Sequence, residues 1–327
     1  MATDERQKVP VGESQKDRMA RRPMHLFLSP RYYGMWFALG LMRASTWLPY
    51  PLQVRFGRLL GRLLHKALKK RRLIANRNIE LCFPELDRHA RREVVRSHFE
   101  SLGLSLIEMA LGWWGSQRKI DRLMTIEGLE HLEKALEQGN GAILLTAHFT
   151  SVEASGSLFK RLAPPFKAMY RTNKNPFLDE VLKRGRLKST DGLISKNDVK
   201  TMLRTLKSNT AVLYAPDQGY RRKPNAVVPF FSVPSLTNVA TSQIARLTGA
   251  PVLPYLPIRL PDNQGYLLSI LPPIEDFPGD DPATDAEKYH HIIEDHIRRD
   301  PSQYYWVHRR FKTDEGLWPD PYLDLSE

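Results

Sequence analysis

A histidine and a carboxylate five residues apart, His148 and Glu153, are the side chains of this chain best suited to chemistry. The apolar residues 142–147 precede the histidine and follow a Gly-Asn-Gly turn, so they predict a buried strand that ends at His148. Thr150 and Ser151 are good helix N-caps, which predicts a helix just beyond. On a continuous helix the pair would point about 140° apart, whereas a strand-to-helix turn can bring the two together. Glu153 would then fix the imidazole tautomer and leave the other ring nitrogen free to take a proton from a hydroxyl.

The same residues also allow a purely structural interpretation. Thr-Ser-Val-Glu at 150–153 is a capping box, in which Glu153 would bond a backbone N–H at the start of the helix. The placement of the polar residues favours catalysis, because His148, Arg171 and Asp217 each follow a predicted strand. Sites in open α/β sheets lie at the carboxyl ends of the strands.

Arg171 and Asp217 each have two interpretations. Arg171 is predicted to lie near a reacting carbonyl or to clamp a substrate phosphate, and the alternative is a surface cation after a strand. Asp217 is a candidate substrate-binding residue. It lies in Asp-Gln-Gly, an ordinary turn, so its carboxylate could instead only orient Arg171 or a loop.

The order of apolar runs and helical patterns predicts an α/β fold, with a mixed, mostly parallel sheet flanked by helices. Asn175-Pro176 is a helix-start signal. Gly-Ala-Pro at 249–251 predicts the end of the helix expected at 235–248. We find no Gly-x-Ser-x-Gly elbow, Walker loop or Gly-x-Gly-x-x-Gly, which argues against a serine hydrolase or a nucleotide-dependent enzyme. The expected helices are 88–111, 130–138, 151–162, 176–187, 197–207, 235–248 and 283–299, and the expected strands are 142–147, 166–170, 211–215, 251–259 and 266–271.

Composition points to an anionic partner. The 327 residues carry a net charge of +13, which suits nucleic acid, an acidic carrier protein or a phosphorylated lipid. No nucleic-acid motif accompanies the charge, and the lone Cys82 excludes a disulfide framework or a Cys-ligated zinc site. His290, His291, Glu294 and His296 do not match the His-Glu-x-x-His order, so we interpret them as a solvated helix face and expect neither a metal nor a cofactor.

The amino-terminal third is predicted to meet a membrane. We divide the chain into a disordered polar tail (1–23), a hydrophobic anchor (24–54), a basic helical membrane-surface segment (55–120) and an α/β domain (121–327). The apolar stretch 32–51 contains one charge and is marginal for a membrane span, so a monotopic anchor or a buried helix are alternatives.

The basic segment begins with an amphipathic helical pattern. Arg55, Arg58, Arg62, Lys66 and Lys69 fall on one face. Leucines and Phe56 fall on the other. Such a helix can lie on an anionic bilayer, or it can pack its leucine face on the domain and leave its charges in water.

Five sequence blocks, in order and at matching spacing, resemble the bacterial lipid A late acyltransferases, the lauroyl- and myristoyltransferases that complete the Kdo-bearing lipid A precursor. The resemblance covers residues 24 to the end. Glu rather than Asp at 153 favours this branch over the glycerolipid acyltransferases. The blocks are Ala-His-Phe-Thr-Ser-Val-Glu at 147–153, Met-Tyr-Arg-Thr-Asn-Lys-Asn-Pro at 169–176, Tyr-Ala-Pro-Asp-Gln at 214–218, Val-Pro-Phe-Phe at 228–231 and Trp-Val-His-Arg-Arg-Phe-Lys at 306–312.

The resemblance implies transfer of a fatty acyl chain, lauroyl or similar, from an acyl carrier protein to the 3-hydroxyl of a hydroxyacyl chain on the lipid A precursor. It also implies an anchor in the bacterial inner membrane with the catalytic domain on the cytoplasmic face. It favours a phosphate-binding role for His308, Arg309 and Arg310, for which structural ion pairs are the alternative. An acyltransferase acting on a lysophospholipid or another glycolipid, and a non-enzymatic membrane or nucleic-acid binding protein, are the competing functions.

Overall fold

A seven-stranded sheet forms the centre of the molecule in the computed structural model, which describes residues 21–219, 224–313 and 317–325. Its strand order is β1-β9-β8-β2-β5-β3-β4, and every neighbouring pair is parallel except β8 and β9. The expected mixed, mostly parallel α/β fold is therefore confirmed. The strands are β1 (Met124–Glu127), β2 (Ala142–Leu145), β3 (Phe166–Tyr170), β4 (Gly192–Ser195), β5 (Ala211–Tyr214), β8 (Val252–Arg259) and β9 (Tyr266–Ile270).

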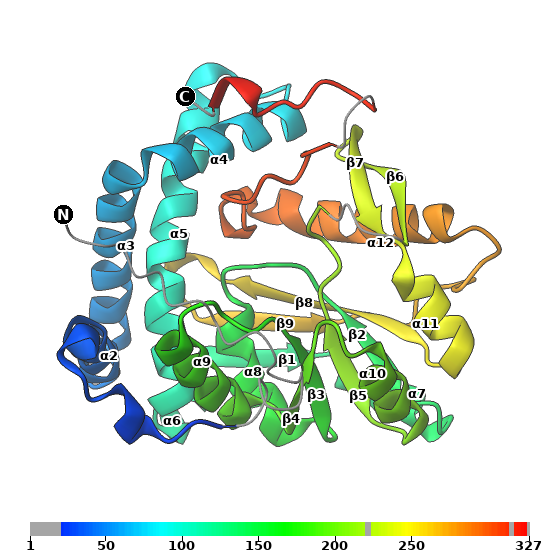
Figure 1. Cartoon of the computed structure of the whole chain (residues 1–327), viewed down its shortest axis with the longest axis horizontal. Helices are drawn as coiled ribbons and strands as arrows, with labels where there is room; N and C mark the ends of the chain where they lie inside the picture. The colour runs from blue at the N-terminus through cyan, green and yellow to red at the C-terminus, as the bar shows by residue number, and fades with distance from the viewer. Residues whose placement is uncertain (1–20, 220–223, 314–316, 326–327) are drawn as a thin grey trace, which may run out of the picture.

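Helices cover both faces of this sheet (Figure 1). Side chains of β2 alternate between the two faces, so that Ala142 and Leu144 pack with α7 and α8 while Ile143 and Leu145 pack with α10, α11 and α12. Both sets are fully buried, which explains why this strand is a continuous apolar run. The helices are α2 (Tyr33–Ser45), α3 (Tyr50–Ala67), α4 (Lys69–Cys82), α5 (Arg88–Trp114), α6 (Gln117–Leu123), α7 (Leu129–Glu137), α8 (Val152–Leu162), α9 (Pro176–Ser189), α10 (Val199–Lys207), α11 (Ala240–Thr248) and α12 (Pro282–Arg299).

Local signals placed most helix ends correctly. Asn175 accepts hydrogen bonds from the backbone N–H groups of residues 177 and 178 and caps α9, and Gly249 takes a left-handed conformation (φ +72°) after α11. The expected helix 235–248 is wrong in its first part. Residues 233–238 instead form β7 (Val233–Asn238), which pairs antiparallel with β6 (Asn225–Phe230), and the Asn238 side chain caps the first turn of α11. Strands β1, β4 and β6 were not predicted, since their apolar residues are interrupted by polar residues, glycine or proline.

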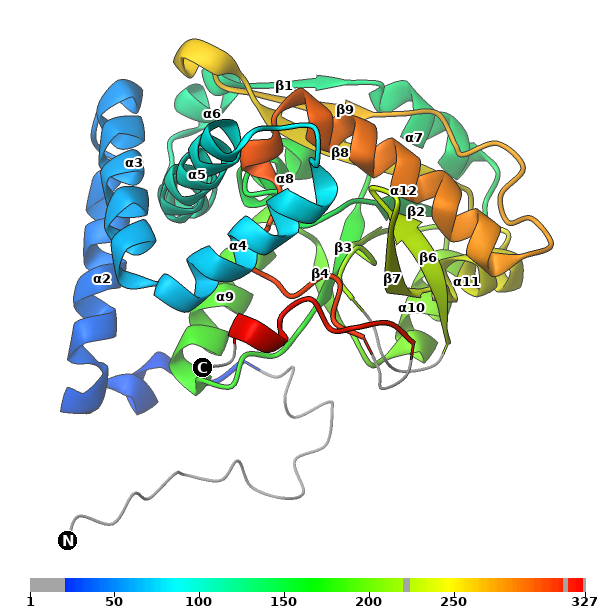
Figure 2. The same ribbon diagram turned by 90° about the horizontal axis from the view of Figure 1, so that it is seen from above.

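The amino-terminal helices form a layer beside the sheet, with α3 running along α5 (Figures 1 and 2). Three glycines make this close approach possible. A Cβ at Gly61 would lie 2.2 Å from the carbonyl oxygen of Phe99, and one at Gly103 would lie 2.2 Å from the backbone nitrogen of Gly61. Gly57 faces Leu104 in the same way. Small residues therefore let the two backbones meet.

This packing bears on the interpretation of the amphipathic helix in which its leucine face packs on the domain. The face of α3 that packs on α5 is the narrow strip of Gln53, Val54, Gly57 and Gly61, not the leucines. Three leucines and one phenylalanine of α3 stay exposed together with the arginines, so the alternative in which the leucine face packs on the domain holds only for its partly buried residues, of which Leu64 packs against the core. The exposed apolar residues are Leu52, Phe56, Leu59 and Leu63.

The apolar stretch 32–51 is not one helix. It comprises α2 and the start of α3, separated by a turn at residues 46–49. Among the described residues, no helix has both the length and the apolar character needed to cross a membrane. The predicted disordered tail lies almost wholly in residues 1–20, outside the described residues.

Candidate active site

Two neighbouring parallel strands bring His148 and Asp217 together. Strand β2 pairs with β5 in a register that sets Leu145 opposite Tyr214. His148 comes three residues after the end of β2, and Asp217 comes three residues after the end of β5. The carboxyl ends of the two strands therefore deliver both side chains to the same edge of the sheet.

The Asp217 carboxylate uses both of its oxygens on His148. Nδ1 of His148 lies 2.6 Å from Oδ1, and the backbone N–H of His148 donates to Oδ2 at 3.0 Å. Asp217 is completely buried, whereas 41% of the His148 side chain is exposed. An ionised carboxylate can only accept, so Nδ1 carries the proton and Nε2 is the acceptor nitrogen. Nε2 makes no hydrogen bond within the part of the chain that the structure describes.

The two charges shift one another's pKa values. Burial alone would lower the pKa of His148, but the Asp217 carboxylate more than offsets this and raises it above the ordinary 6.5. Burial would likewise raise the pKa of Asp217, yet the charge of His148, two hydrogen bonds from that residue and the charge of Arg310 hold it at about 2. Asp217 is therefore ionised throughout the physiological range, and the pKa of His148 is raised above its ordinary value.

Glu153 does not orient His148, which corrects the expectation from the His-x4-Glu spacing. Its Oε1 instead accepts hydrogen bonds from Nε of Arg186 at 2.8 Å and from Nη2 of the same guanidinium. The capping-box alternative is also wrong, because Glu153 bonds no backbone N–H at the helix start. Ser151 precedes α8 as its N-cap residue but donates its hydroxyl to the Pro257 carbonyl. The reason is geometric: α8 begins at Val152, so Glu153 lies in its first turn and contacts α9.

Arg186 is the site residue that the sequence did not reveal. It lies on α9, stacks over the Tyr170 ring at 5.4 Å, and keeps 32% of its side chain exposed. Burial opposes its charge, but the Glu153 carboxylate outweighs burial and raises the pKa of Arg186. Its positive charge reaches His148, whose pKa it lowers slightly. No local motif marks this arginine, because its partner Glu153 lies on another helix, 33 residues away in the sequence.

Arg171 directly follows β3, as predicted, and is exposed. Strand β5 lies between β3 and β2, so the backbones that carry Arg171 and His148 are two strand spacings apart, about 10 Å. Arg171 makes no hydrogen bond or ion pair with the other described residues. Asp217 therefore orients His148, and the interpretation in which it orients Arg171 is wrong.

The three basic residues at 308–310 separate in the structure. Arg310 is 2% exposed, donates to Oγ1 of Thr237 at 3.3 Å and lies 3.2 Å from Nε2 of His290, so it faces the interior. Its charge helps to keep Asp217 ionised. His308 and Arg309 are half-buried and line a surface pocket. Burial lowers the pKa of His308 to about 4, so this side chain is neutral at physiological pH.

A hydrogen-bonded clamp holds the segment that carries His148. The carbonyl of His148 accepts from the backbone N–H of Tyr305 at 3.0 Å, and Phe149 forms a β-bridge with Tyr304. The backbone N–H of Thr150 donates to the Gln303 carbonyl at 2.8 Å. The catalytic segment is therefore fixed to the turn that follows α12.

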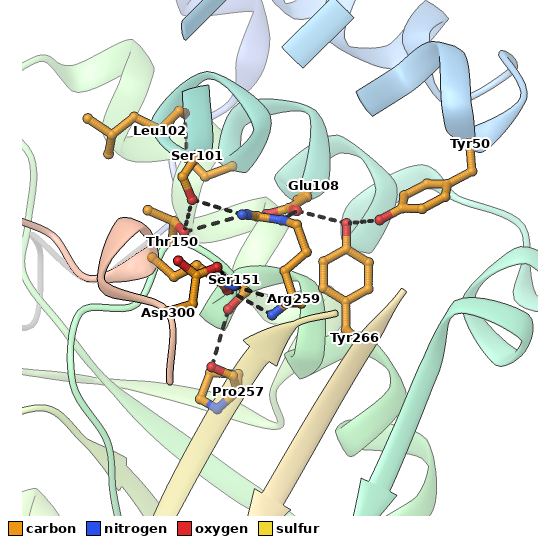
Figure 3. A network of polar contacts seen from close by, with 12 residues as sticks. Tyr50, Ser101, Leu102, Glu108, Thr150, Ser151, Pro257, Arg259, Tyr266 and Asp300 are labelled. Carbon is orange, nitrogen blue, oxygen red and sulfur yellow. Dashed lines mark hydrogen bonds and ion pairs between the residues drawn. The ribbon is translucent and has the colours of Figure 1, made fainter. Parts of the chain in front are cut away.

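A buried polar network fixes this clamp to the helical layer (Figure 3). Arg259, at the end of β8, makes a bidentate ion pair with Glu108 of α5 at 2.6 and 2.8 Å. The same guanidinium donates to the Ser101 hydroxyl at 2.8 Å, and Ser101 in turn bonds Oγ1 of Thr150 at 2.7 Å. The Arg259 backbone N–H donates to Oε1 of Gln303 at 2.7 Å. The position of His148 thus depends on residues from β8 and α5.

Two of the three histidines of α12, His290 and His296, are structural. Nδ1 of His290 lies 2.7 Å from the Pro229 carbonyl, and Nε2 of His296 lies 3.1 Å from the Pro257 carbonyl. Both are buried, so the expected solvated helix face is wrong for these two residues. The described residues contain no cluster of His, Cys, Asp or Glu that could hold a metal ion.

A histidine with a free Nε2, oriented by a buried carboxylate at the edge of a parallel sheet, is the machinery of an enzyme that removes a proton from a hydroxyl. Comparison with known proteins specifies the class. Residues 22–313 match the family described as bacterial lipid A biosynthesis acyltransferase, and this chain belongs to that family.

Several curated relatives share nearly the whole chain. The lipid A biosynthesis lauroyltransferase of Escherichia coli K12 is 38% identical over 88% of this chain and 94% of its own length. The palmitoleoyltransferase of the same organism is 37% identical with the same coverage. Its myristoyltransferase is 27% identical over 90% of this chain and 92% of its own length. The chain is therefore an acyltransferase of lipid A biosynthesis.

Proposed function

We propose that this enzyme transfers a fatty acyl chain from acyl-acyl carrier protein to the 3-hydroxyl of a hydroxyacyl chain on the Kdo-bearing lipid A precursor. The observation that carries the proposal is the buried Asp217 carboxylate on Nδ1 of His148, which leaves Nε2 as the only basic ring nitrogen. The relatives named as lauroyl-, palmitoleoyl- and myristoyltransferases support the reaction type.

In the proposed mechanism, Nε2 of His148 accepts the proton of the acceptor hydroxyl as its oxygen attacks the thioester carbonyl. A tetrahedral oxyanion forms, the C–S bond breaks, and the imidazolium returns its proton to the departing thiolate. The products are an ester and a free thiol, so the base is regenerated in each turnover. Positioned general-base catalysis contributes roughly 10²–10⁴-fold to the rate.

The cation that stabilises the oxyanion is proposed to be Arg186, with Arg171 in the role of substrate contact. Arg186 acts electrostatically on His148 and is held by Glu153, so Glu153 serves as a positioning residue for this cation. A fixed, partly buried cation stabilises developing charge more strongly than a mobile one in water. Arg171 is exposed and can meet an incoming anionic group.

Both proposed substrates are anionic, which fits the net charge of +13. We also propose that α2 and α3 place the enzyme on the inner membrane, with the site on its cytoplasmic side. Exposed large apolar residues on these helices and on the turn between them lie among exposed arginines, the pattern of an interfacial helix. The exposed fractions are 70% for Phe37, 79% for Trp47, 52% for Leu59 and 55% for Leu63.

The decisive experiment incubates membranes containing the enzyme with the Kdo-bearing lipid A precursor and a mixture of acyl-acyl carrier proteins, and analyses the lipid by mass spectrometry. One added acyl mass, absent with His148→Ala, is the expected result and gives the chain length. A parallel incubation with lysophospholipid tests the competing acceptor. Acylation of the lysophospholipid alone would refute the proposed substrate.

The membrane proposal is tested separately by sedimentation with vesicles containing anionic phospholipid. Leu59→Ser together with Leu63→Ser should weaken binding, because about 25 cal/mol per Å² of apolar contact with the bilayer is lost. Leu247→Ser, which removes an equally exposed leucine from α11, is the matched control. Equal vesicle binding by wild type and the double variant would argue against this surface.

A further inference from the structure

A cation-lined pocket of about 510 Å³ lies beside the catalytic pair. Its walls come from the first turns of α4 and from the segment that follows α12, two regions far apart in the sequence. Four lysine and arginine side chains line it, and none of the lining residues among those that the structure describes is acidic. The lining residues are Lys70, Arg71, Ile74, Gly219, His308, Arg309 and Lys312.

Hydrogen bonds fix the two walls to one another. Arg71 donates to the Val307 carbonyl at 3.1 Å. The side-chain amide of Asn78, deeper on α4, donates to the carbonyls of Trp306 at 2.6 Å and His308 at 2.7 Å. The pocket therefore keeps its shape without a ligand, which reduces the entropic cost of binding.

The cations of the pocket lack acidic partners among the described residues. Lys70 and Lys312 form no ion pair there, Arg71 bonds only a carbonyl, and Arg309 stacks on the Tyr322 ring at 5.6 Å. Like charges gathered in one concave place repel one another and concentrate a positive potential. An anion that enters the pocket removes this repulsion.

The pocket adjoins the reacting groups. Gly219 is two residues beyond Asp217, and a Cβ at this position would lie 2.7 Å from the carbonyl oxygen of Arg310, so the chain passes too closely here for a side chain. The charges of Asp217 and His148 both act on His308, which lines the pocket. The charge of a ligand held there would therefore lie close enough to act on the catalytic pair.

We propose that this pocket binds a phosphate group of one of the two substrates, held by Lys70, Arg71, Arg309 and Lys312. The inference deepens the proposed function and rests on it for the identity of the substrates. A phosphate group offers several acceptor oxygens and, as a monoester, close to two negative charges, which matches four cations better than a single carboxylate does. The phosphate can come from the sugar lipid, or it can be the singly charged phosphodiester of the phosphopantetheine arm of the carrier protein.

The first test is direct binding of inorganic pyrophosphate to the full-length enzyme in detergent, measured by calorimetry. Lys70→Gln together with Lys312→Gln should weaken binding by about tenfold or more, since charge-assisted hydrogen bonds are lost. Lys200→Gln together with Lys207→Gln, on α10, makes the same change in net charge outside the pocket and should leave binding within about twofold. Equal weakening by both pairs, or by neither, would overturn the proposal.

The second test identifies the source of the phosphate by steady-state kinetics. If the lipid supplies it, the pocket variant should raise KM for the acceptor about tenfold, and removing the phosphate from the acceptor should abolish the difference from wild type. If the carrier supplies it, KM for the acyl donor should rise instead, and a donor lacking the phosphodiester should abolish the difference. Unchanged KM for both substrates would refute a role in substrate binding.

The two tests separate this proposal from the proposed function. Pyrophosphate binding needs no acyl transfer, so a pocket that binds it in an enzyme inactive on lipid A precursor would leave the pocket standing and refute the substrate. If the variant with both Lys70 and Lys312 replaced acylates the lipid A precursor normally and binds pyrophosphate as wild type does, the proposed function stands and the pocket proposal is refuted.

Discussion

Replacing Asp217 by Asn should disable the base while leaving the fold almost unchanged in shape. The carboxylate accepts from the imidazole with one oxygen and from the His148 backbone N–H with the other. Asparagine has only one oxygen, so its NH₂ must face one of these two donors. If the oxygen keeps the backbone N–H, the amide N–H donates to Nδ1 and forces the proton onto Nε2, which can then no longer accept one.

The expected loss is large. The ordinary pKa of Asp217 is 3.8 and the folded value is about 2. At about 1.36 kcal/mol per pKa unit, the fold favours the ionised carboxylate by about 2 kcal/mol. A wrong imidazole tautomer in a comparable dyad costs about 10⁴ in kcat, so we expect a loss of 10²–10⁴-fold, close to that of His148→Ala.

The pH dependence provides the sharper assay. Because the pKa of His148 is raised above 6.5, wild-type activity should fall as pH drops through a value above 6.5, where the base becomes protonated. In Asp217→Asn the raising charge is gone while burial still lowers the pKa, so the acidic limb of the residual activity should move to lower pH. Activity within about threefold of wild type, with the limb unmoved, would refute the reasoning.

The same linkage has a consequence for stability. A pKa of His148 raised on folding contributes stability that is complete below pH 6.5 and is lost as pH rises through the folded pKa. The lowered pKa of Asp217 contributes stability above pH 3.8 that is lost as pH falls toward about 2. Urea unfolding should be measured for wild type and His148→Ala between pH 5 and 9. The difference in the free energy of unfolding between the two proteins should shrink as the pH rises.

Three further outcomes are expected. Arg259→Gln leaves the buried carboxylate of Glu108 without its ion-pair partner, so the free energy of unfolding in urea should fall by about 3–5 kcal/mol. A loss under about 1 kcal/mol would contradict this. Gly61→Ala should destabilise by about 1–3 kcal/mol because its Cβ meets the α5 backbone, whereas Gly40→Ala, which meets nothing within 4 Å, should be neutral or stabilising by thermal melting. Glu153→Gln should lower kcat less than Asp217→Asn does and leave the acidic limb of the pH–activity profile unmoved, since it loosens Arg186 rather than the base. A larger loss of kcat in Glu153→Gln than in Asp217→Asn would restore Glu153 as the orienting carboxylate.

Local chemistry in the sequence was enough to place most elements. The capping by Asn175, the helix end at Gly249 and the apolar run 142–145 depend on neighbours a few residues away, so each could be predicted without the fold. Strands β1 (Met-Thr-Ile-Glu) and β4 (Gly-Leu-Ile-Ser) were not predicted because they lack the continuous apolar run of β2, which is equally short. Residues 233–238 were assigned to a helix because pairing with β6, which decides their structure, is a tertiary contact.

The site divided in the same way. The sequence by itself determined that His148 ends a buried strand, that Asp217 ends another, and, through the five blocks, which family the chain belongs to. Only the tertiary structure decided that β2 and β5 are neighbours, which puts Asp217 rather than Glu153 on the imidazole across 69 residues of sequence. Spacing along the chain constrains side chains only within one element, whereas strand order sets which loops meet. For the same reason, no local pattern could reveal the pairing of Glu153 with Arg186 or a pocket shared by α4 and the segment after α12.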